Sequence, residues 1–467
     1  MLFNSVDFFI LLGLTVIAYW ITQSLNWRQN ILLCASLIFY AYWFPPYIFL
    51  VGLLAGIAYL GARKASQGKR VFLVITIAAL LMVLAGFKYT NFAIGLFNQS
   101  LTVLGETGAV STINLLAPLG ISFISFQLIA YIVDVYRQHI PPEKNFRTFL
   151  LFICFFPQLI AGPICRANQL IPQIKRKQTF SLNRFASGLL LLLIGLCLKV
   201  SFADGLAPFV DNVFAVQQDY QKQPVFWATV GFGVQIFCDF WGYSTMAVGA
   251  ARLFGIDVPI NFHLPYVSHT LREFWRRWHI TLSHWFRDYL YIPLGGSRQG
   301  QGITIRNLIL TMGLCGLWHG ANLTFVVWGL LHGVYLAVER LFLKRVQKND
   351  FGIWIPKLVK PFGWLVTMIF LSITWIFFRA ASLEQALNLT SVAFSPQQLL
   401  NLNALPKSFW LILVAFAILQ FPLQGLIASS QSNRISIDRA LVLSGWLAVI
   451  SIVMSAGESV EFIYFDF

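Results

Sequence analysis

Long apolar runs, separated by short charged segments, constrain this chain more than any other feature of its sequence. Of its 467 residues, 58% are hydrophobic and 11% are charged, whereas soluble domains carry about 25% charged residues. A helix of about 20 apolar residues is long enough to cross the hydrocarbon core of a bilayer. We therefore predict an all-α protein that crosses a membrane many times.

The apolar runs predict about eleven transmembrane helices. The stretches between them are too short for a soluble domain, so we expect one membrane-embedded domain over residues 1–467. Segment 149–163 is apolar but short, contains two prolines and a glycine, and has basic flanks, which favours a re-entrant segment. Segment 244–254 is expected to be short and partly embedded. The expected crossings are residues 6–21, 31–42, 47–62, 71–89, 115–136, 185–203, 225–240, two short ones that meet inside 307–338, 362–378, 408–427 and 440–455.

The net charge of +15 follows the expected topology and does not indicate a nucleic-acid partner. Most Lys and Arg residues lie at Arg28 or in segments 63–70, 137–147, 166–184, 272–306, 340–360 and 434–439, whereas segments 91–114, 204–224 and 380–406 hold only Lys222. Loops on the cytoplasmic side carry the excess of basic residues. We therefore expect the basic segments inside, facing anionic lipids, and both termini outside. The run 6–21 has no basic residues before it, which favours a spanning helix over a cleaved signal peptide.

Residues 271–290 form the first candidate functional segment. As one helix, they place an apolar stripe opposite Arg272, Arg276 and Arg287, which is typical of a helix lying in the membrane interface. His279 falls at the border of the stripe. One interpretation is an anchor helix whose histidine lies at the lipid boundary; the other is that Arg276 and Arg277 bind the phosphates of an acyl donor while His279 faces inward. The stripe consists of Leu271, Phe274, Trp275, Trp278, Leu282, Trp285, Phe286 and Tyr289.

The second candidate segment is Leu317-Trp-His-Gly-Ala-Asn322, inside a long apolar run. A histidine can move a proton near neutral pH, and polar groups at membrane depth usually mark a substrate path. His319 suits the base that takes a proton from a hydroxyl as it attacks a thioester. Trp318, His279, or Asn322 on the same face if the turn is helical, are candidates to hold the donor or stabilise the oxyanion. The other interpretation is a neutral histidine hydrogen-bonded within a helix bundle.

Asp239 is the one acid within an otherwise apolar predicted crossing, in Gln235-Ile-Phe-Cys-Asp-Phe-Trp-Gly-Tyr-Ser244. We expect it to face the protein interior. It fits a substrate-binding role together with Tyr243, and it fits equally a structural role as a partner of Tyr243, Arg252 or Lys199.

Other catalytic and metal signatures are not found in the sequence. Six cysteines are scattered singly, with no Cys-x-x-Cys, so neither a disulfide framework nor a metal site is predicted. There is no P-loop, dinucleotide fingerprint, His-Glu-x-x-His or Gly-x-Ser-x-Gly. A tightly bound cofactor and a covalent serine mechanism are therefore not expected. The remaining histidines, His139, His263, His269, His284 and His332, are interpreted as loop or packing residues.

Several motifs, in order along nearly the whole chain, resemble the membrane-bound O-acyltransferase superfamily and, within it, the alginate O-acetylation branch. Gln158, Trp241 and Thr245 depart from the pattern that we expect of this branch. The motifs are Pro118-Leu-Gly-Ile-Ser-Phe-Ile-Ser-Phe-Gln127, Phe156-Pro-Gln-Leu-Ile-Ala-Gly-Pro163, Trp275-Arg-Arg-Trp-His-Ile-Thr-Leu-Ser283, Trp285-Phe-Arg-Asp-Tyr-Leu-Tyr-Ile-Pro-Leu-Gly-Gly296, Gly316-Leu-Trp-His-Gly-Ala-Asn322, Trp328-Gly-Leu-Leu-His-Gly333 and Phe462-Ile-Tyr-Phe465.

The resemblance implies a helical bundle around a transmembrane tunnel in a bacterial inner membrane. His319 matches the superfamily's catalytic histidine and His279 its second polar position. The donor implied is acetyl-CoA or an acyl-carrier thioester on the cytoplasmic side. The acceptor implied is an exported polysaccharide or an extracytoplasmic partner protein. Trp275, Trp318, Tyr289, Tyr243, Asp239, Asn322, Arg276 and Arg277 are the expected substrate-binding residues.

Three alternatives stay open from the sequence. The first is transfer of D-alanine from a carrier protein to teichoic acid, which uses the same chemistry. The second is a transporter or flippase of polysaccharide export, although no internal repeat typical of transporters is found. The third is a non-enzymatic membrane anchor for a polysaccharide export complex.

Overall fold

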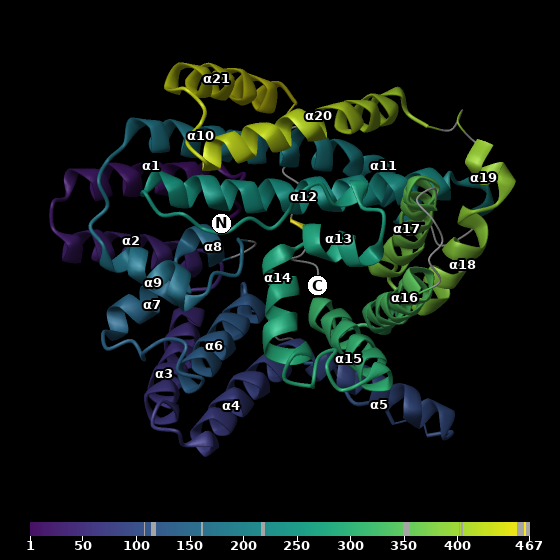
Figure 1. Ribbon diagram of the computed structural model, residues 1–467, viewed down its shortest axis with the longest axis horizontal. Helices are drawn as coiled ribbons and strands as arrows, with labels where there is room; N and C mark the ends of the chain where they lie inside the picture. The colour runs from purple at the N-terminus through teal and green to yellow at the C-terminus, as the bar shows by residue number, and fades with distance from the viewer. Residues whose placement is uncertain are drawn as a thin grey trace. The chain divides into compact units, whose positions relative to one another are not determined.

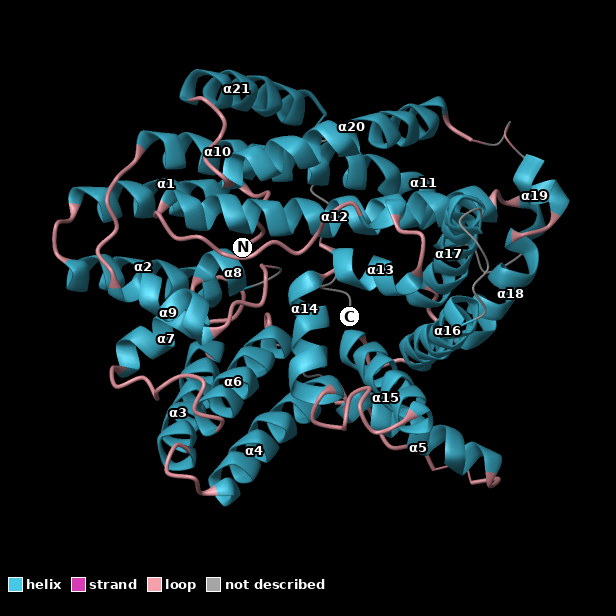
Figure 2. Ribbon diagram, in the orientation of Figure 1, coloured by secondary structure: helices cyan, strands magenta, loops and turns pink. Residues whose placement is uncertain are grey.

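The computed structural model describes residues 1–467 except 107, 114–117, 160–161, 216–219, 349–354, 401, 403–404, 455–461 and 464–467, and it describes the backbone alone at 346–348, 355–359 and 399–400. Every regular element among the described residues is a helix (Figure 2). The predicted all-α fold is therefore confirmed. The contacts divide the chain into two units, residues 1–185 with 250–259, and residues 186–249 with 260–467. The expected single domain stays a prediction.

The first unit contains the N-terminal helices (Figure 1). Its interior is aromatic: the Phe8 ring stacks on Phe3 with centroids 4.6 Å apart and contacts Phe39 and Phe156 edge-on. The side chain of Ser5 accepts a hydrogen bond from the Phe8 amide and so begins the first helix. The helices are α1 (Val6–Ile21), α2 (Leu25–Ala41), α3 (Tyr47–Ala65), α4 (Arg70–Lys88), α5 (Thr90–Val103), α6 (Ile121–Tyr136), α7 (Phe146–Cys154), α8 (Phe156–Leu159) and α9 (Ala167–Lys175).

The segment predicted to be re-entrant is broken and buried. Helix α7 ends at Cys154 and α8 begins at Phe156, so the helix is broken at Phe155. Residues 160–161 lie outside the described part. Gln158, which departs from the branch pattern, is 3% exposed and donates to the carbonyl oxygen of Phe152 at 2.7 Å. Neither helix approaches the ~20 residues needed for a crossing, which agrees with the prediction.

The second unit contains the remaining helices, wholly or for most of their length (Figure 1). They are α10 (Leu182–Cys197), the π-helix η1 (Leu198–Ala203), α11 (Asp204–Ala215), the 3-10 helix η2 (Tyr220–Lys222), α12 (Val225–Leu253), the 3-10 helix η3 (Pro265–Val267), α13 (Leu271–Arg277), α14 (Ile280–Phe286), the π-helix η4 (Arg287–Tyr291), α15 (Gln301–His319), α16 (Leu323–Lys348), α17 (Ile355–Arg379), α18 (Leu383–Ala393), α19 (Pro396–Leu400), α20 (Lys407–Gln431) and α21 (Ile437–Met454).

Helices α15 and α16 form a closely packed hairpin. A Cβ at Gly316 would collide with the carbonyl oxygen of Phe325, and one at Gly329 would collide with that of Met312. Glycine therefore allows the two backbones to approach closely, as small residues do between membrane helices. The predicted break near His319 is correct, because α15 ends at His319 and α16 begins at Leu323. Of the two short crossings expected to meet there, α16 is long and apolar enough to span a membrane and α15 is not.

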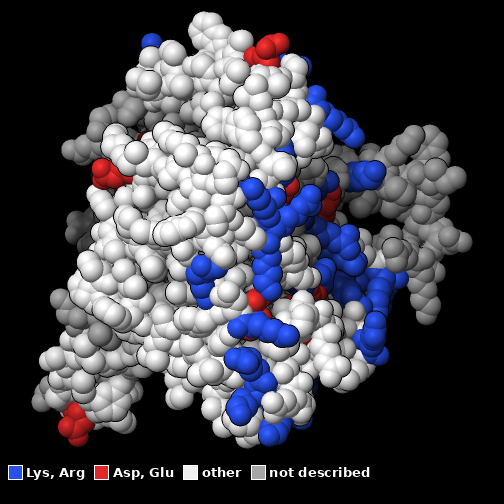
Figure 3. Space-filling model, turned by 90° about the vertical axis from the view of Figure 1, so that its left-hand side faces the viewer, with Lys and Arg blue, Asp and Glu red and all other residues white. Residues whose placement is uncertain are grey.

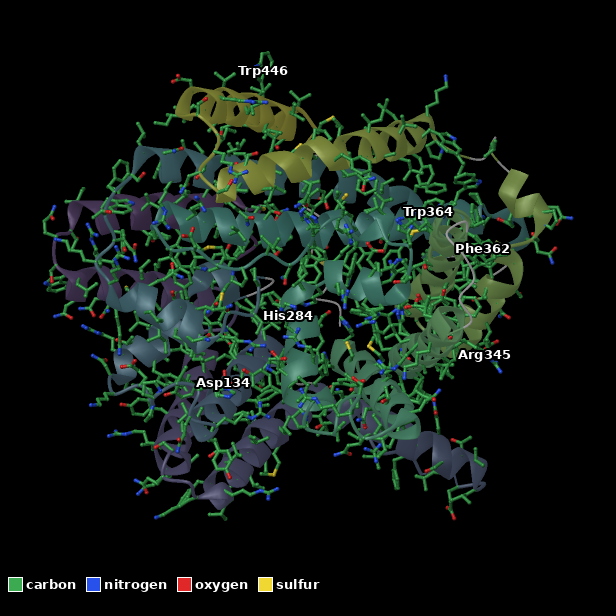
Figure 4. The ribbon with its side chains drawn as sticks, in the orientation of Figure 1. Asp134, His284, Arg345, Phe362, Trp364 and Trp446 are labelled. Atoms are coloured by element: carbon green, nitrogen blue, oxygen red, sulfur yellow. The ribbon has the colours of Figure 1, made fainter. Side chains whose placement is uncertain are left out.

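Eight helices in the described part of the chain are long and apolar enough to cross a membrane, and α1 and α6 are shorter apolar helices. Many large apolar side chains point outward from them. Trp446 on α21 and Phe362 on α17 are 65% and 68% exposed (Figure 4). Lipid accommodates such side chains at no cost, so the chain is a multi-pass membrane protein.

Two boundaries predicted from the sequence are wrong. The run expected to end at residue 203 continues through η1 and α11 to Ala215, and segment 244–254 is not a separate short element because α12 continues to Leu253. The apolar pattern looked interrupted at two polar residues, Asp204 and Ser244. Asp204 is paired with Lys199 at 2.7 Å and Ser244 is buried, so the protein interior accommodates both and the helices continue.

Basic side chains are distributed unevenly over the surface. On the face shown in Figure 3, Lys and Arg gather in one band, and the rest of that face is largely uncharged. The same separation exists along the sequence, between the basic segments and those that hold only Lys222. This distribution is typical of the positive-inside rule.

Candidate active site

His319 occupies the last position of α15, where the chain turns toward α16. The residue is 3% exposed, and Gly320 follows it with an extended backbone. Three aromatic rings surround its imidazole: Trp318 at 5.0 Å, Trp328 at 5.1 Å and Phe378 at 5.3 Å between ring centroids. The imidazole therefore lies in an aromatic enclosure built from α15, α16 and α17.

His279 lies in the same unit and contacts the same tryptophan. Its ring is 6.4 Å from the Trp318 ring and 4.6 Å, edge-on, from the Phe240 ring. It is fully buried, and burial lowers its pKa to about 3. The expectation that His279 and Trp318 lie close to His319 therefore has geometric support, with Trp318 contacting both imidazoles.

Residues 271–290 do not form the single helix expected from their periodicity. The chain breaks at Trp278 and His279, where His279 adopts a left-handed conformation with φ of 41°. The cause is a competing set of hydrogen bonds from the preceding loop: the backbone carbonyl of Asn261 accepts from the Ile280 amide, and its side chain accepts from the Thr281 hydroxyl at 2.6 Å. This break turns His279 inward, away from the border of the apolar stripe.

His332 was interpreted as a packing residue, yet it is bonded through both ring nitrogens. Its Nδ1 accepts from the Trp275 indole N–H at 3.3 Å, and its Nε2 lies 3.2 Å from Thr374 Oγ1. Because the Thr374 hydroxyl donates to the carbonyl oxygen of Leu371, it accepts from His332. The imidazole is therefore held as the neutral tautomer protonated at Nε2.

One tryptophan, Trp328, connects this bonded histidine to His319. The Trp328 ring is 4.6 Å from His332, 5.9 Å from Trp275 and 5.1 Å from His319. Trp328 is 1% exposed, and its indole N–H has no hydrogen-bond acceptor among the described residues. Sequence reasoning missed Trp328 and His332, although the Trp328-Gly-Leu-Leu-His-Gly333 motif contains both.

The sequence predicted that Asn322 would share a face with His319 if the turn between them were helical. The turn is not helical. The backbone leaves the helix at Gly320, and the Asn322 side chain caps α16 by accepting from the Thr324 amide at 3.1 Å. Its amide nitrogen donates to the carbonyl oxygen of Ala381 at 2.9 Å. Asn322 thus fixes the turn after His319 and connects it to the segment between α17 and α18.

Other predicted substrate-binding residues lie on α13 and η4. Arg276 is exposed, whereas Arg277 is bound to Glu273 at 2.8 Å and donates to the carbonyl oxygen of His263. Tyr289 lies on η4 with its ring 5.4 Å from Trp285. The ion pair leaves Arg276 better placed than Arg277 to meet an anion.

Asp239 belongs to a buried ion cluster at η1. Lys199, 1% exposed, lies 2.8 Å from Asp239 Oδ1 and 2.7 Å from Asp204 Oδ1. The other Asp239 oxygen accepts from the backbone amide of Ile463, and Lys199 lies 5.9 Å from the Tyr243 ring. Of the two roles left open, this geometry supports the structural one, with Lys199 as partner.

Two cavities of the second unit lie near the aromatic enclosure, although His319 lines neither. One, of about 180 Å³, is almost entirely apolar and is lined on α15 by Thr311, Met312 and Cys315, four residues before His319. Trp275 lines the same cavity. The other, of about 800 Å³, has both polar and apolar lining residues, from α11, η2, α17, α18 and the α17–α18 connection. Among the described residues, no group of three or more His, Cys, Asp or Glu side chains is arranged to hold a metal ion.

The fold and this site define a class: a multi-pass helical membrane protein with buried imidazoles at a helix break. Residues 137–379 match the model of the membrane-bound O-acyltransferase family. The chain belongs to this family and is an O-acyltransferase.

Three relatives indicate the range of the similarity. The chain is 39% identical over 405 residues to the probable alginate O-acetylase AlgI of Azotobacter vinelandii, covering 85% of this chain and 78% of that protein. It is 39% identical over 388 residues to the peptidoglycan O-acetyltransferase of Helicobacter pylori, covering 76% and 72%. It is 30% identical over 248 residues to the teichoic acid D-alanyltransferase of Streptococcus thermophilus, covering 50% and 59%.

Proposed function

We propose that this protein moves an acetyl group from a cytoplasmic thioester, acetyl-CoA or an acyl carrier, to a hydroxyl of an exported or cell-surface polysaccharide, directly or through an extracytoplasmic partner protein. The observation that carries the proposal is His319, a buried imidazole at the end of α15, enclosed by aromatic rings. The two most extensive similarities described above, to proteins named as O-acetylating enzymes, support acetyl as the group.

In the proposed reaction His319 is the general base. Its imidazole takes the proton of the acceptor hydroxyl as that oxygen attacks the thioester carbonyl, forming a tetrahedral oxyanion. The oxyanion collapses, the C–S bond breaks, and the imidazolium returns the proton to the leaving thiolate. The products are an ester and a free thiol, and His319 ends in the neutral form in which it began.

The oxyanion needs a fixed donor, and Trp328 is the residue we assign to that role. Its indole N–H is buried beside His319 and has no acceptor among the described residues. A donor already oriented in a water-poor site stabilises developing negative charge at little reorganisation cost. Trp318 and His279 remain candidates to orient the donor, since Trp318 contacts both imidazoles.

The apolar cavity is the proposed donor side. It is lined by α14, η4 and α15, which adjoin or fall within the basic segment 272–306 that we expect in the cytoplasm. Arg287 at this cavity is exposed and forms an ion pair with Asp288 at 2.7 Å. Trp275, whose indole N–H donates to His332, forms part of the cavity wall. In the proposed reaction the thioester passes Trp275 to reach His319.

The larger cavity, of about 800 Å³, is the proposed acceptor side. Its walls come from α11, η2, α18 and the α17–α18 connection, in or next to segments 204–224 and 380–406, which hold only one basic residue, Lys222. The positive-inside rule assigns these segments to the outer face of a bacterial inner membrane, which also gives the expected outer position of both termini.

The test is thiol release by purified protein supplied with acetyl-CoA and a hydroxyl acceptor. His319→Ala should abolish release, and His284→Ala should not, because His284 is an exposed histidine on α14 (Figure 4) and serves as a matched control. Movement of an unmodified solute without thiol release, unchanged in His319→Ala, would establish a transporter or flippase instead. Release from a D-alanyl carrier but not from acetyl donors would favour the teichoic acid alternative.

A further inference from the structure

Helix α14 begins at a residue whose side chain does not cap it. The carbonyl oxygen of His279 accepts from the Ser283 amide at 3.0 Å, but its imidazole accepts from none of the described amides of α14. At this position a side-chain oxygen commonly satisfies an amide of the first turn. His279 is also left-handed, with φ of 41°, which costs free energy in a residue with a Cβ atom. Both features need support from outside α14.

Asn261 supplies that support from the preceding loop. Its backbone carbonyl oxygen accepts from the Ile280 amide at 2.9 Å. Its Oδ1 accepts from the Thr281 hydroxyl at 2.6 Å and from the Thr281 amide at 3.4 Å. These two amides are the first of α14, and the Asn261 side chain that reaches them is buried. Asn261 therefore caps α14 in place of the residue that begins it.

A second contact joins the same loop to the end of α13. The His263 amide donates to the carbonyl oxygen of Arg277 at 3.0 Å, and the Arg277 guanidinium donates to the carbonyl oxygen of His263 at 3.3 Å. Together with the bonds of Asn261, these fix the chain on both sides of His279. Leu264, next along the loop, is left-handed too, with φ of 48°. Residues other than glycine keep such conformations where the surrounding structure fixes them, and here the loop and the helix break fix each other.

The helix break decides where the second imidazole of the site lies. His279 is fully buried, with its ring 6.4 Å from the Trp318 ring, which in turn packs 5.0 Å from the His319 ring. A continuous helix over residues 271–290, which their periodicity favours, would place His279 at the border of the apolar stripe instead. The hydrogen bonds of Asn261 oppose that helix and so keep the imidazole inside the protein.

We infer that Asn261 is a positioning residue of the acyl transfer, which acts through His279 by holding the left-handed turn that directs this imidazole toward Trp318. The inference rests on the proposed function for the reaction and for the role of His279 in orienting the donor. The capping of α14 by Asn261 is a separate property, which is measured without turnover.

The first experiment measures the position of His279 by chemical protection. Diethyl pyrocarbonate modifies accessible neutral imidazoles, and mass spectrometry of the peptides compares the wild type with Asn261→Leu and Asn261→Asp in one detergent. His279 should be protected in the wild type and in Asn261→Asp, which keeps the acceptor oxygens. It should be about tenfold more reactive in Asn261→Leu, because a cap and a buried hydrogen bond are lost together. His284, an exposed histidine of α14 (Figure 4), is the internal control and should react equally in all three proteins.

The second experiment measures whether this position matters for catalysis. Asn261→Leu should lower kcat for thiol release about tenfold, as misplacement of an orienting group does. In protein that already carries His279→Ala, the same substitution should lower the melting temperature as before but leave kcat unchanged. Asn261→Asp should restore most of kcat. Thr281→Val, which removes only the hydroxyl donor, gives the same comparison with a smaller loss if Asn261→Leu does not fold.

Two results would overturn the inference while leaving the proposed function intact. One is an equal loss of kcat from Asn261→Leu with and without His279→Ala, which would show that Asn261 only stabilises the fold. The other is a His279 that stays equally protected in every variant. A wild-type protein that shows the expected protection but releases no thiol would refute the proposed function instead.

Discussion

The hydrogen bond between Trp275 and His332 should couple the two residues in both stability and catalysis. In a double-mutant cycle, Trp275→Phe removes the donor, His332→Phe removes the acceptor, and the double variant removes both. The bond joins neutral groups at a donor–acceptor distance of 3.3 Å, slightly longer than the 2.7–3.2 Å typical of such bonds. Neutral hydrogen bonds contribute about 0.5–1.5 kcal/mol, so we expect a coupling energy of about 0.5–1 kcal/mol.

The assay is thiol release under kcat/KM conditions, with the melting temperature of each variant measured in the same detergent. His332→Phe alone should destabilise the fold by about 1–3 kcal/mol, because it leaves the indole N–H and the Thr374 hydroxyl without their partner. When the double-mutant cycle is measured by kcat/KM, this coupling energy corresponds to a factor of about two to five in kcat/KM. A double variant whose rate loss equals the product of the two single losses would refute the claim that His332 positions Trp275.

Three further predictions concern other parts of the site. Trp328→Phe should lower kcat about 10²–10³-fold with donor binding unchanged, as removal of an oxyanion donor does; an unchanged kcat contradicts the assignment. Asp239→Asn should destabilise the protein by about 1.5–3 kcal/mol, because Lys199 loses one charged partner and keeps the other, Asp204; a wild-type melting temperature contradicts this. Burial holds the pKa of His279 at about 3, so between pH 6.5 and 5 the unfolded chain binds a proton that the folded chain does not. Stability therefore falls toward acid pH by about 1.4 kcal/mol per unit at this site, and His279→Gln should make the melting temperature less dependent on pH; an unchanged pH dependence contradicts the burial.

Composition and apolar run length predicted the helical membrane fold, because a bilayer admits few alternatives. They also predicted the break between α15 and α16, since glycines and a histidine interrupt an otherwise apolar run. They did not predict the break at His279. Periodicity alone favours a continuous helix there, and the competing hydrogen bonds come from Asn261, 18 positions earlier in the sequence.

The sequence pointed to some residues of the candidate site and not to others, because only some of them are unusual for their surroundings. Residues that carry unusual chemistry for their surroundings, His319 and Asp239, stand out in the sequence. Trp328 and His332 do not, because an aromatic residue on an apolar helix is indistinguishable from core packing until its neighbours are known. Their roles depend on Trp275 and Thr374, which approach them from α13 and α17.

The most direct test of the account is transfer of label across a sealed bilayer. Proteoliposomes with a single orientation would receive a thioester carrying a labelled acetyl group on one side and hold a hydroxyl acceptor on the other. The account predicts labelled ester on the acceptor side and free thiol on the donor side, with His284→Ala equal to wild type and His319→Ala producing neither. Labelled ester made at the wild-type rate by His319→Ala would contradict it.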